Sequence, residues 1–148
     1  MPTPCRPGTI LIAGSTAIAL LLGDTLQRGG RCVAVVDRKR PDASTHADLL
    51  AAWIEGDPCD PSALRRARAE EAVAMISATQ SDTATVAAAI IGRRFFRIER
   101  VVAVVHDPER AELLGDHGVE VLCATSLIAG DVLSSLGIAD PRHSRSQP

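Results

Sequence analysis

Short apolar segments alternate along the chain with longer segments rich in alanine, leucine and arginine. Two of the short segments, Val33–Val36 and Val101–Val105, are apolar at consecutive positions rather than at alternate ones. A strand of that kind needs cover on both faces, which is typical of a parallel sheet between layers of helices. The predicted strands are Thr9–Ala13, Cys32–Val36, Trp53–Glu55, Ala72–Ser77, Val101–Val105 and Val119–Leu122.

Helix signals mark the limits of the longer segments. Gly29-Gly30 follows the first of them, and Asp60-Pro61 and Asp107-Pro108 each place a capping aspartate before a proline at the first helical position. The predicted helices are Ala17–Arg28, Ala43–Ala52, Pro61–Ala69, Asp82–Phe96, Pro108–His117 and one near Ser126–Leu136. Alternating strands and helices predict an α/β fold in three layers, with a doubly wound, six-stranded parallel sheet in the middle.

The chain length fits one domain of this kind. It has 148 residues, and ordinary domains have about 100–200. The predicted elements occupy nearly all of residues 9–137, which we assign to a single domain. Residues 1–8 and 138–148 are rich in proline, serine, arginine and histidine and are predicted to be flexible tails.

Composition excludes several classes of function. The net charge of -2 gives no general attraction to nucleic acid, and an aromatic content of 2% does not supply a stacking surface for bases. The apolar segment Ile10–Leu22 is interrupted by Gly14-Ser15-Thr16, and it is shorter than the ~20 residues of a membrane-spanning helix. None of the four cysteines has zinc-ligand spacing, so no metal is expected. We expect a cytoplasmic protein without direct membrane insertion.

A glycine loop joins the first strand to the first helix. It reads Gly14-Ser15-Thr16-Ala17-Ile18-Ala19, at the position where a GxGxxG/A loop binds the phosphates of dinucleotides. Thr16 takes the place of the middle glycine, where a pyrophosphate normally approaches the backbone. Its hydroxyl either binds a phosphate or caps the helix. The loop alone leaves open a phosphate site and a purely structural turn.

An acidic residue ends the second strand. Asp37 follows Gly14 by about 20 residues, the position of the carboxylate that accepts hydrogen bonds from an adenosine ribose. Arg38-Lys39-Arg40 would attract a 2′-phosphate, which Asp37 would repel, so NAD(H), ADP or ATP is favoured over NADP. The alternatives are that Asp37 only ends a strand and that the basic triplet is a solvated loop.

Two further segments carry a family resemblance. Residues 56–64 read GDPCDPSAL after the third strand, and residues 106–114 read HDPERAELL after the fifth, with GVEV at 118–121. In these segments, which are more specific than the glycine loop, the chain resembles the KTN or RCK-N domain (TrkA-N). This is the Rossmann-like nucleotide-binding regulatory domain of Trk/Ktr-type potassium uptake systems and Kef-type efflux systems. The resemblance extends from about Thr9 to Leu136.

The resemblance implies a site assembled from four loops. The phosphates would lie against Gly14, Ser15, Thr16, Ala17 and Ile18. Asp37, with Arg38 beside it, would hold the ribose, and Gly56 and Asp57 would lie beside the adenine. Ala78 and Thr79 would lie across the cleft near the second phosphate or ribose. The resemblance further implies a homodimer, or docking on a separate membrane transporter subunit at the inner face of the membrane.

Two residues depart from the family pattern. Thr16 replaces the middle glycine, and Val104 stands where many members carry an arginine that reaches the ligand's phosphates.

The sequence is therefore compatible with three functions. The first is a non-catalytic regulatory module in which a nucleotide shifts the arrangement of a dimer. The second is a small NAD-dependent oxidoreductase, for which His106 is the best candidate acid or base. The third is a degenerate Rossmann module kept for protein–protein contact.

Overall fold

The computed structural model describes residues 6–40, 52–112 and 117–142. Its centre is a sheet of strands β1 (Arg6–Ala13), β2 (Arg31–Asp37), β3 (Trp53–Glu55), β4 (Ala72–Ser77), β5 (Arg100–Val105) and β6 (Glu120–Cys123). The strand order is β3-β2-β1-β4-β5-β6, and every neighbouring pair is parallel. The predicted α/β fold with a six-stranded parallel sheet is confirmed.

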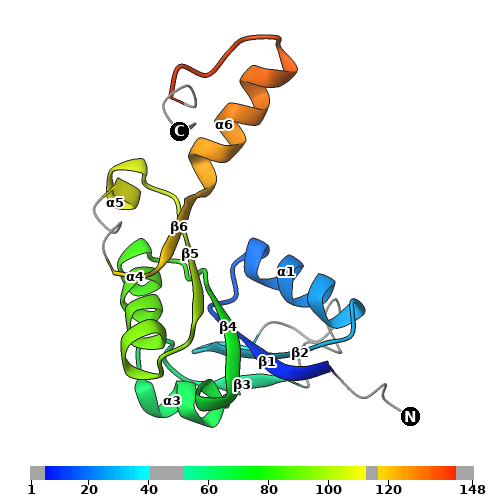
Figure 1. Ribbon diagram of the computed structural model, residues 1–148, viewed down its shortest axis with the longest axis vertical. Coiled ribbons are helices and arrows are strands. Elements are labelled where there is room, and N and C mark those ends of the chain that lie inside the picture. The colour runs from blue at the N-terminus through cyan, green and yellow to red at the C-terminus, as the bar shows by residue number, and fades with distance from the viewer. Residues whose placement is uncertain (1–5, 41–51, 113–116, 143–148) are drawn as a thin grey trace.

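Helices lie on both faces of the sheet (Figure 1). Helix α1 (Ala17–Arg28) covers one face, and α3 (Pro61–Arg66) and α4 (Asp82–Ile90) cover the other. Two separate apolar clusters match these layers. One joins α1 to the sheet through Ala19, Ile12 and Val35, and the other joins α3 and α4 to it through residues such as Leu64, Ala88 and Met75.

Several elements begin or end away from their predicted limits: β1, β2, β5 and β6 among the strands and α3, α4 and α6 (Ala124–Ser135) among the helices. Strand β1 begins at Arg6, so Arg6–Gly8 belong to a strand and not to a tail. A register irregularity between Arg6 and Thr9, with Gly8 at φ +91°, lets the strand continue past Pro7. Helix α3 ends at Arg66 because Arg68 adopts a left-handed conformation. The predicted helix Ala43–Ala52 lies, except for Ala52, outside the described residues.

The end of α4 is also different from a simple helix. Ile91–Phe95 forms a π-helical turn in place of the last turn predicted for Asp82–Phe96. A Cβ at Gly92 would lie 2.2 Å from the sulfur of Met75, so a larger residue here would displace the buried Met75 side chain. Helix α5 (Pro108–Glu112) follows β5, and residues 113–116 lie outside the described part.

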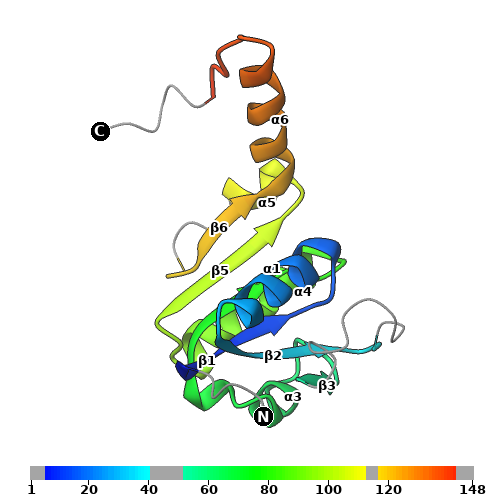
Figure 2. The ribbon, with the colours of Figure 1, turned by 90° about the vertical axis from the view of Figure 1, so that its right-hand side faces the viewer.

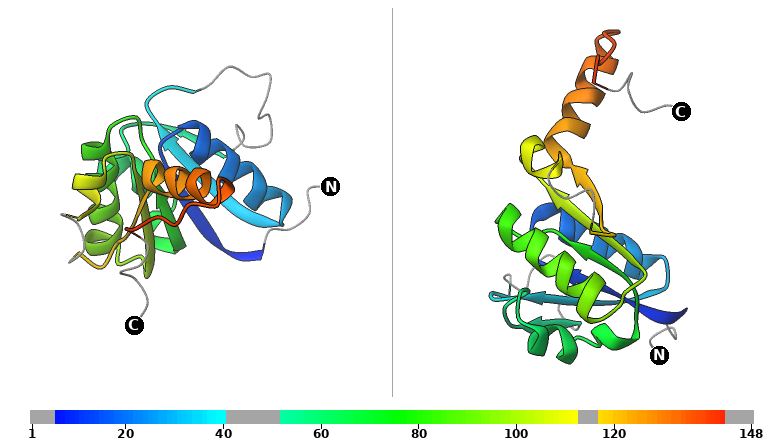
Figure 3. Two further views of the ribbon diagram at one scale, coloured as in Figure 1. Left: turned by 90° about the horizontal axis from the view of Figure 1, so that it is seen from above. Right: turned by 60° about the vertical axis from the view of Figure 1, so that its left-hand side comes forward.

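Helix α6 (Ala124–Ser135) does not pack on the sheet. It begins directly after β6 and extends away from the layered body, as two perpendicular views show (Figures 1 and 2). None of its residues is buried, and Leu127, Ile128 and Val132 are exposed. In the view from above, α6 extends across the middle of the layered body, from the side of α4 toward α1 (Figure 3). No helix in the described ranges is long and apolar enough to cross a membrane.

Candidate functional site

The candidate residues gather at the carboxyl ends of the strands, where open α/β sheets bind their ligands. The strand order reverses between β1 and β4, which makes the ends of these two strands the switch point at which such sheets bind ligands. The structure places the predicted residues in two groups around this point. One group lies on the β1–β2–β3 side and the other at the junction of β1 with β4.

The first group is centred on Asp37 at the end of β2. One carboxylate oxygen, Oδ1, accepts the backbone N–H of Arg38 at 2.7 Å, and the other, Oδ2, accepts the hydroxyl of Ser15. Ser15 and Asp37 are 22 positions apart in the sequence. Since both side chains are only part-buried, a ribose can approach the carboxylate by exchanging with the serine hydroxyl.

Asp57 extends this group over β3. Its Oδ1 accepts the backbone N–H of Cys59 at 2.9 Å, and its Oδ2 lies 2.7 Å from the Arg38 guanidinium. These two donors hold the pKa of Asp57 below its ordinary value. Gly56 precedes it, and its N–H donates to the Asp37 carbonyl at 3.0 Å. The backbone of the β3 loop is thus fixed to the end of β2.

Cys59 lies beside this loop with a part-buried thiol. Burial raises the pKa of Cys59, and the neighbouring charge of Asp57 acts in the same direction. Its Sγ donates to the Ala84 carbonyl at 3.4 Å. A protonated, hydrogen-bonded thiol of this kind packs the loop against α4.

The second group joins the glycine loop to β4. Gly14 has φ +106°, and its N–H donates to the Val36 carbonyl at 2.8 Å. A Cβ at Gly14 would lie 2.2 Å from the Ala78 carbonyl oxygen, so the turn rests directly on the end of β4. Ala78 in turn donates its N–H to the Ala13 carbonyl at 2.8 Å. Only glycine fits this conformation at this contact.

Thr16 connects the same two loops through its side chain. Its Oγ1 donates to the Ala78 carbonyl at 2.9 Å and accepts the N–H of Ala19 at 3.4 Å. It is therefore the N-cap of α1. Ala17 and Ile18 form the exposed first turn of that helix, where backbone N–H groups attract an anion.

Thr79 takes part in an internal network. Its N–H donates to Thr85 Oγ1 at 2.9 Å, and its own hydroxyl donates to the Ser81 carbonyl at 2.8 Å. Thr79 is 7% exposed and Thr85 fully buried. Thr85 was not among the predicted residues, because nothing in the sequence of α4 marks one threonine as the partner of a loop.

Asp82 also goes beyond the sequence prediction. Its carboxylate accepts the backbone N–H groups of His106 at 3.0 Å and of Asp107 at 2.8 Å, which ties the start of α4 to the loop after β5. Burial by itself raises the pKa of Asp82, but these backbone donors outweigh it and the pKa lies below its ordinary value. His106 is exposed at this junction, with Nδ1 3.3 Å from Asp82 Oδ1.

This arrangement predicts a pH-dependent stability. A lowered folded pKa means that Asp82 stabilises the fold above its unfolded pKa and loses this effect as the pH falls below about 4. We expect Asp82→Asn to lower the free energy of unfolding by about 1.5–3 kcal/mol at pH 7. The difference from the unsubstituted protein should shrink toward pH 3 in urea titrations. Glu109→Gln, on exposed α5, is the control, and a pH-independent difference would contradict the assignment.

A family comparison decides what kind of domain this is. The family model for the TrkA-N domain matches residues 10–125. The chain belongs to the TrkA-N domain family. That match includes the second half of β1, the glycine loop, Asp37 and the loops after β3, β4 and β5, so the family predicted from the sequence is confirmed.

Individual relatives extend this result. The chain is 30% identical over 131 residues to the Trk system potassium uptake protein TrkA of Streptomyces coelicolor, covering 86% of this chain and 57% of the relative. The TrkA-N chain thus spans less than two thirds of that protein. The fold is similar to that of the GsuK channel bound to NAD, with TM-score 0.75 and 23% identity over 89% of this chain and 24% of that one. It is also similar to the Kef CTD of Shewanella denitrificans in its AMP-bound form, with TM-score 0.67 and 18% identity over 88% and 82%.

Proposed function

We propose that this TrkA-N chain is a non-catalytic regulatory module of a potassium transport system, and that it binds an adenine nucleotide at the carboxyl ends of β1, β2 and β3. The observation that carries the proposal is the Ser15–Asp37 contact beside the exposed first turn of α1. This arrangement offers a carboxylate to ribose hydroxyls and backbone N–H groups to a phosphate within one βαβ unit.

The neighbouring charges support an unphosphorylated ribose. Asp37 would repel a 2′-phosphate, and the Arg38 guanidinium that would attract one is paired with Asp57 at 2.7 Å. NAD(H), AMP, ADP or ATP therefore fits better than NADP. Two similar folds, the GsuK channel and the Kef CTD, have structures with NAD and with AMP.

A ligand panel tests nucleotide binding. We expect AMP, ADP, ATP, NAD or NADH to raise the melting temperature of the purified chain, because a ligand that binds only the folded state stabilises it. At a ligand concentration near 100 times Kd, binding should increase the free energy of unfolding by about 2.7 kcal/mol. Absence of a shift with every nucleotide at millimolar concentration would favour a module kept for protein contact. Oxidation of NADH with a carbonyl substrate would favour an oxidoreductase instead.

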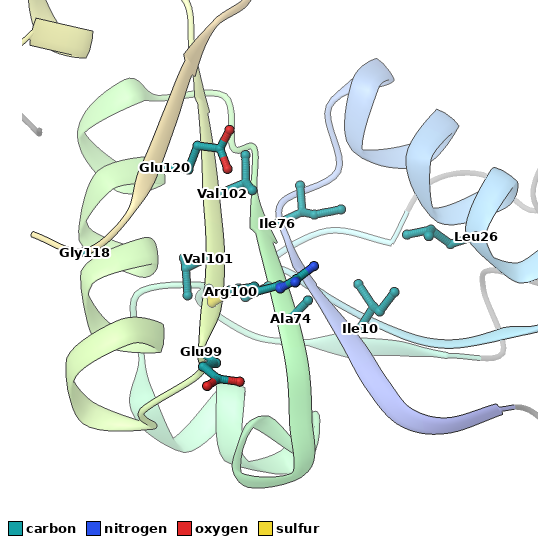
Figure 4. A pocket seen from close by; sticks show the side chains of 11 residues that line it. Ile10, Leu26, Ala74, Ile76, Glu99, Arg100, Val101, Val102, Gly118 and Glu120 are labelled. Atoms are coloured by element: carbon teal, nitrogen blue, oxygen red, sulfur yellow. The ribbon is translucent and has the colours of Figure 1, made fainter. Parts of the chain in front are cut away.

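The signalling step we propose is a rearrangement of a homodimer. Helix α6 presents Ile128, Val132 and Leu136 at intervals of four residues, and each is more than half exposed. Beside α1, Ile10, Ala74 and Ile76 line a pocket together with charged residues such as Arg100 and Glu120 (Figure 4). The apolar stripe on α6 supports contact between two copies. A nucleotide that favours one arrangement of the two copies would thereby favour one conformation of a transporter subunit at the inner face of the membrane.

The exposed apolar residues Ile128 and Val132 on α6 lead to a prediction for the oligomeric state. We expect the double substitution Ile128→Asp and Val132→Asp to convert a dimer into a monomer, because two carboxylates would be buried in the apolar contact. Sedimentation velocity measures the mass of the species in solution. Ser134→Asp, on another side of α6, is the matched control and should leave the dimer intact. A dimer that survives the double substitution would exclude α6 from the interface.

A further inference from the structure

The side chain of Thr16 links the loops after β1 and β4, where the two halves of the sheet meet. Its hydroxyl donates to the Ala78 carbonyl at 2.9 Å and accepts from the Ala19 N–H at 3.4 Å, so it joins residues 62 positions apart in the sequence. The hydroxyl hydrogen of Thr16 and one lone pair of its oxygen therefore already take part in hydrogen bonds. These two hydrogen bonds hold the Thr16 side chain between the glycine loop and the end of β4.

The backbone at Gly14, at the start of the same loop, also lies close to the end of β4. A Cβ at Gly14 would lie 2.8 Å from Thr79 Cα as well as 2.2 Å from the Ala78 oxygen. A dinucleotide on a doubly wound sheet passes its pyrophosphate over this point, and a middle glycine lets the phosphates approach the backbone there. In this chain the threonine side chain occupies that path.

The loops on the two sides of this switch point offer different polar groups to a ligand. The β1–β3 side has the Asp37 carboxylate for a ribose and the first turn of α1 for a phosphate. On the β4–β5 side, Val104 is 5% exposed and packs in the apolar cluster with Ala78, so it presents no cation.

The remaining charges on the β4–β5 side are unfavourable for a second phosphate. Asp82 and Asp107 place two carboxylates at the loops after β4 and β5. Arg110 donates to Thr83 and lies 3.8 Å from the Asp107 carboxylate, and His106 Nδ1 lies 3.3 Å from the Asp82 carboxylate, so both basic side chains already face these acids. This side repels an anionic group that would have to cross from the adenosine side.

We infer that Thr16 is a specificity-determining residue that makes the site select an adenosine mononucleotide over a dinucleotide. The inference rests on the proposed nucleotide site and narrows its ligand class. A mononucleotide places its ribose at Asp37 and its phosphate at the start of α1 without crossing Thr16. A dinucleotide must displace the threonine from the Ala78 carbonyl and then meet Asp82 and Asp107.

Calorimetric titrations with AMP and NAD test the inference on the whole chain. We expect the unsubstituted protein to bind AMP at least about tenfold more tightly than NAD. Thr16→Gly should raise the affinity for NAD relative to the affinity for AMP by about tenfold. Glycine is among the residues that natural helices use at the N-cap, so Thr16→Gly keeps a usable start for α1.

Thr16→Ser provides the matched variant, because it keeps the hydroxyl and removes only the methyl group. Intermediate NAD affinity in Thr16→Ser would support a steric role for Thr16. Equal affinities of the unsubstituted protein for AMP and NAD, or the same affinity ratio in Thr16→Gly, would overturn the inference while leaving the proposed function intact. Binding of neither nucleotide to any of the three proteins would overturn the proposed function, and the inference with it.

Discussion

Replacing Asp37 with alanine should weaken AMP binding about 10- to 100-fold. The carboxylate is the group in the candidate site placed to accept hydrogen bonds from both ribose hydroxyls, and hydrogen bonds to a charged group contribute about 1.5–3 kcal/mol. The Ser15 hydroxyl that now donates to Asp37 would remain, but it carries no charge. Isothermal titration calorimetry gives the affinity of each variant directly.

Asp24→Ala is the control for this experiment. Asp24 lies on α1 and pairs with Arg28 at 3.2 Å, so its removal changes the net charge by the same amount. Its AMP affinity should equal that of the unsubstituted protein. If Asp37→Ala also bound AMP normally, the ribose would lie elsewhere and the site as placed here would be wrong.

The largest effect on stability is expected for Gly14→Ala. The new methyl group would lie 2.2 Å from the Ala78 carbonyl oxygen and 2.6 Å from its carbonyl carbon, both backbone atoms that a side-chain rotation cannot move. The residue also has φ +106°, which alanine rarely adopts. Strain and steric overlap together place this substitution among the severe ones, so we expect a loss of about 4 kcal/mol or more in the free energy of unfolding.

Gly30→Ala separates the two causes. Gly30 has φ +78°, but no atom lies within 4 Å of the position that the new methyl group would take, so this variant reports only the conformational cost of about 1–2 kcal/mol. Urea titrations of both variants measure the difference. Equal losses would mean that the contact between the glycine loop and β4 contributes nothing to stability.

Much of the fold followed from local sequence patterns. Helix α1 and strands β3 and β4 have the predicted limits, and Gly29-Gly30 ends the helix as expected. The limits that differ depend on tertiary contacts. Gly92 against Met75 accompanies the π-helical turn, and the β1 irregularity at Gly8 adds three residues to the strand.

The candidate site was predictable in its parts and not in its connections. Gly14, Asp37 and Asp57 stand at the ends of strands, a position that the alternation of elements already gives. The hydrogen bonds from Thr16 to Ala78 and from His106 to Asp82 join residues 62 and 24 positions apart. They depend on the adjacency of β1, β4 and β5 and on side-chain rotamers, neither of which leaves a local signal. Thr85 is hidden for the same reason.

The most direct test of the central claim is native mass spectrometry of the purified chain titrated with AMP. The central claim is that one adenine nucleotide binds per chain at the carboxyl ends of β1, β2 and β3. We therefore expect a mass increase of one AMP per chain for the unsubstituted protein and for Asp24→Ala, and no such increase for Asp37→Ala at the same concentration. An unchanged mass of the unsubstituted protein with AMP, ADP and NAD at millimolar concentration would contradict the account.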